Sequence, residues 1–187
     1  MRLFAAVELP EPARRLVLAH VGGVRRDLPS AARVRAEALH LTLVFFGDVA
    51  TESAGGLAAA LAAGARSCAQ FTARLAGAGG FPPRGPVRVA WLGVEPAEAL
   101  GALAAAVRAA AAAAGFAFDA KPFAPHVTLA RCRSPWPAPW RDRLARLAPE
   151  EPVAWPVRRA LLVESALAPG GARYSTVAEL PLAGEAA

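Results

Sequence analysis

The chain has 187 residues and a formal net charge of +6, and 55% of its residues are hydrophobic while 19% are charged. These proportions exclude a disordered protein, because they allow a sizeable core, and they suit one domain. The positive charge favours anionic partners without singling out any of them. Cys68 and Cys132 lie far apart and lack metal-binding spacing, so we expect two reduced thiols.

The first ten residues contain only a short apolar run, which Glu8 and Pro10 interrupt. Such a run is too short for a signal peptide or a spanning helix. The alanine-rich stretch over 99–114 contains Gly101 and Arg108, and it favours a helix over a membrane span. We therefore expect a cytoplasmic protein without a membrane partner.

Apolar periodicity and turn residues predict alternating strands and helices in the first half of the chain. Thr51 is expected to cap a helix that ends near Ala65, with Glu52 in its first turn. The segment 79–86 is rich in glycine and proline, and we expect it to be a turn between two strands. In chain order, we expect a strand over 3–9, a helix over 11–28, a strand over 39–46, the helix after Thr51, and strands over 71–78 and 87–94.

The second half continues this alternation and contains no composition break that would mark a linker. A helix over 96–114 should stop at Gly115, and the Pro- and Trp-rich segment 134–139 is expected to be a loop. Pro169-Gly170-Gly171 has the chemistry of a hairpin turn. The other elements expected are a strand over 126–131, a short helix over 141–147, and strands over 157–167 and 173–182. The chain 1–187 is therefore expected to form one α+β domain, with sheets packed against helices.

One tetrapeptide pattern occurs twice. His40-Leu41-Thr42-Leu43 recurs as His126-Val127-Thr128-Leu129, each within an expected strand, in a chain that has three histidines. Residues i and i+2 of a strand project from the same face. Each strand therefore presents an imidazole and a hydroxyl side by side, with aliphatic side chains on the opposite face.

Two imidazoles and two hydroxyls around one centre would suit in-line displacement at phosphorus, if the two strands face each other across a cleft. A neutral histidine can take a proton from water, and an imidazolium can give one to the leaving ribose oxygen. The hydroxyls of Thr42 and Thr128 can donate to the phosphate oxygens. This chemistry requires no metal, and we expect neither a metal nor a cofactor.

A single histidine beside a threonine is usually a structural residue, so one copy of the pattern would not indicate a functional site. Two copies in matching contexts favour a functional pair. His20 lies in an expected helix without a threonine partner, and we interpret it as structural.

Over nearly its whole length, the sequence resembles the two-histidine (2H) phosphoesterase superfamily. Within that superfamily it is similar to the bacterial RNA 2′,3′-cyclic phosphodiesterases, also called 2′-5′ RNA ligases. The paired motifs carry this resemblance. They are accompanied by the opening 1–7, the segments 39–47, 88–94 and 122–131, and the closing Glu164-Ser165, Pro169-Gly170-Gly171 and Arg173-Tyr174.

The resemblance implies a bilobal fold of two similar antiparallel-sheet lobes with flanking helices, related by a pseudo-two-fold axis around a central groove. It implies metal-independent hydrolysis of RNA 2′,3′-cyclic phosphate ends to 2′-phosphates, together with weak 2′-5′ ligation of RNA such as tRNA halves. His126 is assigned as the base that activates water, and His40 as the acid that protonates the departing 3′ oxygen; the reverse assignment stays open. Thr42 and Thr128 are expected to bind the phosphate.

Arg131 carries over from the resemblance as a further phosphate ligand. Strict alternation would place it on the face opposite His126, so it needs a bulge or a strand end to reach the groove. Phe46 shares the face of His40 by alternation, and it could stack on a base or be a core aromatic.

The sequence departs from the family at two positions. Relatives often carry a basic residue where Val44 stands, and an aromatic residue near Arg33. Arg33, Arg35 and Lys121 could supply the missing RNA contacts or be ordinary solvated charges.

Two other functions stay open. The chain could be a non-catalytic binder of RNA ends, or a 2H phosphodiesterase that acts on another small cyclic or 2′-5′ nucleotide. Intact histidine and threonine in both motifs favour catalysis over binding alone. We expect a monomer, and the sequence leaves open whether the loops over 79–86 and 135–139 cover the groove.

Overall fold

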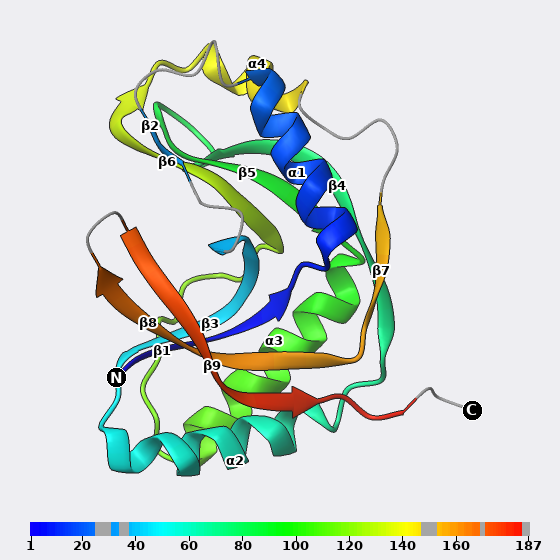
Figure 1. Ribbon diagram of the computed structural model, residues 1–187, viewed down its shortest axis with the longest axis vertical. Coiled ribbons are helices and arrows are strands. Elements are labelled where there is room, and N and C mark those ends of the chain that lie inside the picture. Colours follow the sequence, from blue (N-terminus) through cyan, green and yellow to red (C-terminus); the bar gives the residue numbers. More distant parts are fainter. Residues whose placement is uncertain (25–30, 34–37, 147–152, 169–170, 185–187) are drawn as a thin grey trace.

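The computed structural model describes residues 1–24, 31–33, 38–146, 153–168 and 171–184 (Figure 1). The first half contains β1 (Arg2–Glu8), α1 (Glu11–Val24), β2 (Ala31–Arg33), β3 (His40–Asp48), the 3-10 turn η2 (Thr51–Ser53) and α2 (Ala54–Ala65). The second half contains β4 (Phe71–Phe81), β5 (Val87–Glu95), α3 (Ala97–Ala113), β6 (His126–Trp136), α4 (Trp140–Ala145), β7 (Ala154–Val157), β8 (Arg159–Ala168) and β9 (Gly171–Pro181).

The described strands form one antiparallel sheet with the order β7-β4-β5-β6-β3-β1-β8-β9, and β2 pairs with β6. The motif strands β3 and β6 are neighbours at its centre, and Leu41 with Val127 is the residue pair that joins them. Figure 1 shows β5 and β6 in the upper part of the molecule and β1, β8 and β9 in the lower part. The expected α+β class is confirmed, and the two expected lobes are halves of one continuous sheet.

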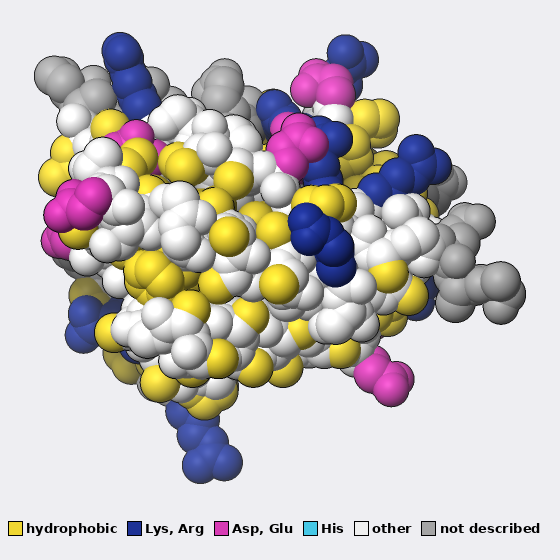
Figure 2. Space-filling model, turned by 90° about the horizontal axis from the view of Figure 1, so that it is seen from below, with side chains coloured by type: hydrophobic (Ala, Val, Ile, Leu, Met, Phe, Trp, Pro, Cys, Tyr) yellow, Lys and Arg dark blue, Asp and Glu magenta, His cyan; other side chains and the backbone are white. Residues whose placement is uncertain are grey.

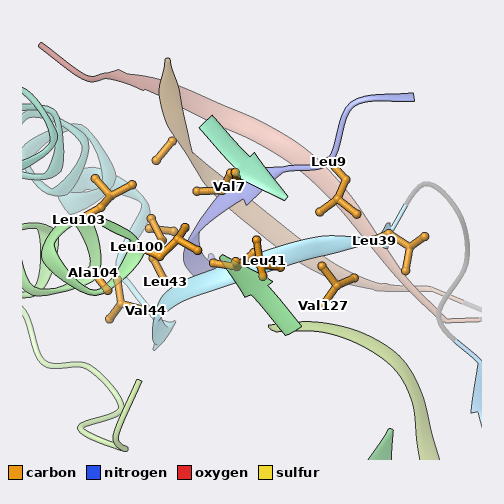
Figure 3. Packing of buried hydrophobic residues seen from close by; sticks show 14 of the residues in the cluster. Val7, Leu9, Leu39, Leu41, Leu43, Val44, Leu100, Leu103, Ala104 and Val127 are labelled. Atoms are coloured by element: carbon orange, nitrogen blue, oxygen red, sulfur yellow. The ribbon is translucent and has the colours of Figure 1, made fainter. Parts of the chain in front are cut away.

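The main hydrophobic core lies between this sheet and the helices, with α2 and α3 on one part of it and the fully buried Ala13 and Val17 of α1 on another. Leu100, Leu103 and Ala104 of α3 are buried against the side of β3 that carries Leu43 and Val44 (Figure 3). A smaller apolar cluster, formed by Phe4, Ala6, Leu161 and Val163 with Phe45 packed against it, is separate from the main core. The sheet is therefore apolar on both faces at its β1 side.

Small residues allow α2 and α3 to pack closely. A Cβ atom at Gly64 would come within 2.8 Å of the carbonyl oxygen of Ala106, so an alanine there would force the helices apart. The face seen from below in Figure 1, where α2 lies, shows small apolar side chains, with charged groups mainly near its margins and no visible histidine (Figure 2). None of the helices in the described ranges is long and apolar enough to cross a membrane.

Two expected loop segments are strands in the structure. β4 continues to Phe81 and β6 continues to Trp136, so 79–81 and 134–136 are not turn or loop residues. The reason is their pairing with β5, in which Phe81 faces Val89 and Trp136 faces Val87. Tertiary ladder hydrogen bonds thus override the high Gly, Pro and Trp content of these segments.

Two other boundaries also differ from expectation. Thr51 does not cap an α-helix, because it begins the turn η2, and α2 starts at Ala54 with no side-chain cap from Ser53. The strand expected over 157–167 is divided at Arg158 into β7 and β8. Parts of the expected 11–28 and 141–147 helices and of the Pro169-Gly170-Gly171 turn lie outside the described residues. Cys68 and Cys132 are both free thiols.

The junction of the two halves predicts a stability effect. Leu41 is fully buried where β3 meets β6, so Leu41→Ala should leave a cavity and lower the free energy of unfolding by about 2–5 kcal/mol. Urea denaturation followed by circular dichroism measures this change. Leu167→Ala is the matched control, because Leu167 is 84% exposed and its loss should cost little. If both variants lost the same free energy of unfolding, burial of Leu41 at the junction would not be what stabilises the fold.

Candidate active site

The two motifs have the side-chain alternation that their sequences predict. In β3, Leu41 and Leu43 are buried while His40 and Thr42 are partly exposed. In β6, Val127 and Leu129 are likewise buried, while His126 and Thr128 are partly exposed. Each histidine therefore shares a face with its threonine, opposite the core.

The pairing of Leu41 with Val127 determines how the four polar side chains lie. Both paired residues point into the core, so their neighbours on both strands project from the opposite face of the sheet. In an antiparallel pair, the residue before Leu41 lies beside the residue after Val127. His40 and Thr128 therefore lie on one side of this junction, and Thr42 and His126 lie on the other, which places the two histidines diagonally.

Both motif strands contain a bulge at the same place. Successive β1 residues pair with Thr42 and Val44, which leaves Leu43 as the extra residue of β3. Successive β5 residues pair with Thr128 and Ala130, which leaves Leu129 as the extra residue of β6. A bulge shifts the alternation by one residue, so the third residue after each threonine returns to the face of the motif.

The bulge brings Arg131 to the face of His126 and Thr128, as the sequence argument required. The cation lies near enough to both imidazoles to lower their pKa values. The same shift turns Phe46 away from the face of His40, which agrees with the core-aromatic alternative and leaves base stacking by Phe46 unsupported. Phe46 is only 8% exposed and belongs to the main core, where it packs edge-on against Phe118, while Phe45 takes the face of His40.

The backbone holds the two imidazoles in the same way. Nδ1 of His40 lies 2.8 Å from the carbonyl oxygen of Ala38, and Nδ1 of His126 lies 2.7 Å from that of Ala124. A carbonyl oxygen can only accept, so each Nδ1 carries the hydrogen and donates it. Each neutral ring therefore has an unprotonated Nε2 available to the site.

Both histidines are held in the neutral form. Burial lowers the pKa of His40 to about 4, and the nearby charges of Arg131 and His126 act in the same direction, against the hydrogen bond to Ala38. Burial and Arg131 also lower the pKa of His126, against the hydrogen bond to Ala124. At neutral pH the site therefore combines two neutral imidazoles with one fixed cation, an arrangement suited to an anion.

Aromatic side chains flank each histidine, and strand periodicity did not predict them. Phe4 and Tyr174 lie beside His40 with ring centroids 4.7 and 5.2 Å away. Phe81 lies edge-on to His126 at 4.9 Å. They come from strands distant in sequence, and the signals were Phe4 in the opening segment and Tyr174 in the closing segment of the family resemblance.

A hollow of about 150 Å³ opens beside His40. Its floor is the smaller apolar cluster, and its polar groups are Glu8, Arg14 and Thr176. Tyr174, which is 38% exposed, also lines it. His40 also lines this hollow, so the hollow adjoins the histidine-bearing face of the sheet.

The other residues that the sequence offered as RNA contacts are not placed at this site by the described part of the structure. Val44 is buried in the core, and Lys121 is an exposed residue whose Nζ lies 2.7 Å from Asp119. Arg35 and the side chains of His20 and Arg33 lie outside what the structure describes. Among the described residues, no three His, Cys, Asp or Glu side chains gather closely enough to hold a metal ion.

The position of Arg131 predicts the titration of both histidines. Arg131→Met removes a cation that disfavours protonation, so the pKa of His40 should rise above about 4 and that of His126 should rise toward 6.5. Imidazole NMR signals followed against pH measure both values. Arg66→Met, at the end of α2, is the control and should change neither. Unchanged titrations in Arg131→Met would mean that its guanidinium does not face the pair.

A family model of the 2′-5′ RNA ligase superfamily matches residues 10–168. An RNA 2′,3′-cyclic phosphodiesterase of Geobacillus stearothermophilus is 34% identical over 97% of this chain, which spans 57% of that longer relative. One from Thermus thermophilus is 36% identical over 99% of this chain and 92% of its own length.

Two solved structures share the fold over almost the whole chain. TT0787 of Thermus thermophilus has a TM-score of 0.80 at 36% identity and covers 100% of both chains. Escherichia coli LigT in complex with 3′-AMP has a TM-score of 0.78 at 32% identity and covers 97% of both chains. The chain therefore belongs to the 2′-5′ RNA ligase (2H phosphoesterase) superfamily, and within it to the group of RNA 2′,3′-cyclic phosphodiesterases.

Proposed function

We propose that the protein hydrolyses 2′,3′-cyclic phosphate ends of RNA to 2′-phosphates, with His40 and His126 as an acid–base pair and without a metal ion. The observation that carries this proposal is the junction of the two His-x-Thr strands at Leu41 and Val127. It gathers two imidazoles and two hydroxyls on one face, beside the cation of Arg131. A cyclic phosphodiester is an anion that needs charge neutralisation and two proton transfers, which these groups can supply.

In the proposed reaction, Arg131 neutralises the phosphate, and the hydroxyls of Thr42 and Thr128 donate to its non-bridging oxygens. Nε2 of His126 takes a proton from water as the water oxygen bonds to phosphorus. The bond from phosphorus to the 3′ oxygen breaks in line, and His40 gives its Nε2 proton to that oxygen. The product is a 2′-phosphate, and His126 returns its proton to solvent while His40 regains one. The assignment of base and acid follows the family resemblance.

The acid step requires a proton that His40 lacks in the free protein, because its pKa is about 4. Binding of the anionic phosphate would offset the field of Arg131 and raise the pKa of both histidines. We therefore infer that substrate binds together with one proton. The same displacement with the 5′ hydroxyl of a second RNA in place of water would give weak 2′-5′ ligation.

The hollow beside His40 supports a nucleoside as the group attached to the phosphate. A ribose phosphate held by both histidines would extend into this space, whose apolar floor and Tyr174 ring suit a base. The complex of the similar LigT with 3′-AMP is consistent with a mononucleotide-sized site.

The acid–base assignment predicts large and similar losses in two variants. His40→Ala and His126→Ala should each lower kcat by about 10²- to 10⁴-fold, because each removes one proton transfer. The assay follows an RNA oligonucleotide with a 2′,3′-cyclic phosphate end in EDTA, and it resolves 2′- from 3′-phosphate products. His20→Ala is the matched control and should retain activity. Full activity in either motif variant would exclude the mechanism, and binding without turnover by the wild type would favour a non-catalytic binder.

The nucleoside site predicts a different kind of defect. Tyr174→Ala should raise KM at least about fivefold, because base–aromatic stacking contributes roughly 1–3 kcal/mol per base. Tyr174→Phe should behave as the wild type, and so should Val177→Ala, since Val177 is exposed on the same strand but does not line the hollow. The KM increase caused by Tyr174→Ala should disappear when the RNA has an abasic terminal residue. The same KM increase on abasic RNA would show that Tyr174 acts on His40 instead of the base.

A further inference from the structure

The connection between β4 and β5 is fastened by one arginine of helix α4. The guanidinium of Arg141 donates to the carbonyl oxygens of Gly80 at 2.9 Å, Pro82 at 2.6 Å and Gly85 at 2.7 Å. The residues 82–86 are all exposed, so core packing does not hold them. A planar guanidinium with five donors is suited to holding several carbonyls in a fixed geometry.

The same connection carries an aromatic contact to the active site. Phe81 ends β4 next to Pro82, and its ring lies 4.9 Å from the His126 ring at an interplanar angle of 81°. Phe81 pairs with Val89, and Val89 pairs with Arg131, so these three side chains share the face of His126. Phe81 is therefore a wall of the site, located one residue from two of the carbonyls that Arg141 holds.

Phe81 also packs against Trp91 of β5, and the end of β4 packs against helix α4. The Phe81 ring lies 5.4 Å from that of Trp91, which covers Gly79 so closely that a Cβ there would come within 2.6 Å of the indole. A Cβ at Gly80 would meet Val87 at 2.6 Å and Leu144 of α4 at 3.3 Å, so α4 lies directly against the end of β4. Movement of α4 or of the turn would therefore be transmitted to Phe81.

We propose that Arg141 is a positioning residue for His126: by holding the β4–β5 connection, it keeps Phe81 against the imidazole and fixes the orientation of the ring. This inference rests on the proposed role of His126 as one member of the acid–base pair. Arg141 itself does not touch the substrate; it acts through Phe81. Its role complements the hydrogen bond from Nδ1 to Ala124, which holds the other edge of the ring.

The surroundings of His126 define what should change when this support is lost. In the described part of the chain, the charged or titratable groups that face it are Arg131 on its own strand and His40 on β3. β4 and β5 contribute the uncharged rings of Phe81 and Trp91. Loss of the Phe81 contact should therefore let water reach the imidazole, with no change in the charges around it.

The test is Arg141→Met, followed by NMR titration of both active-site histidines and by steady-state kinetics. The pKa of His126 should rise toward 6.5 while that of His40 stays near 4. The kcat value should fall about tenfold or more, because the imidazole is less well oriented, and KM should change less than twofold. Arg143→Met is the matched control on the same helix, since Arg143 stacks on Trp140 and should leave all three quantities unchanged.

A double variant separates positioning from a purely structural role. In a Phe81→Ala background, Arg141→Met should have little further effect on the pKa of His126 or on kcat. The ring through which Arg141 acts on His126 is already absent from that background. A lowered Tm with unchanged pKa and kcat would overturn the proposal, and so would an equal kcat loss in the Phe81→Ala background. If Arg141→Met does not fold, Arg141→Lys, which cannot hold all three carbonyls, replaces it. The titration gives its answer even if the wild type does not hydrolyse cyclic phosphates, so failure of the proposed function is seen separately.

Discussion

The pairing of Leu41 with Val127 is the contact on which the rest of the site depends. It joins two halves of the sheet that are otherwise built from their own strands, and it does so between equivalent residues of the two motifs. Because both side chains are fully buried, a slip of one residue would turn the polar groups of a motif into the core. Hydrophobic burial thus specifies the register that gathers both histidines and both threonines on one face of the sheet.

The electrostatics of the site follow from the same burial. Imidazoles placed close to the core lose hydration, and a neighbouring guanidinium further disfavours their protonation. Backbone carbonyls two residues earlier keep both rings in one tautomer without adding a negative charge. Because both imidazoles are neutral, Arg131 gives the site a positive charge that an anionic phosphate can neutralise, and we interpret the lowered pKa values as suited to binding an anion.

Equivalent motifs do not give an equivalent site. The matching bulges bring the third residue after each threonine to the face of the two histidines, but this residue is Arg131 in one strand and Phe45 in the other. The hollow lies on the β1 side, beside His40, whereas the aromatic wall of Phe81 lies beside His126. A ligand between the two histidines would therefore meet different surroundings on its two sides.

The amino-acid sequence by itself determined the α+β class, most of the elements, and the shared face of histidine and threonine, because strand periodicity is a local property. It could not determine the side on which Phe46 lies, since a bulge depends on pairing with β1. In the sequence, only the consecutive apolar pairs Leu43-Val44 and Leu129-Ala130 indicated the two bulges. Tertiary structure decided three other features: the extensions of β4 and β6, the aromatic rings beside the histidines, and the hydrogen bonds of Arg141 to the β4–β5 connection. Each of these joins residues far apart in the chain.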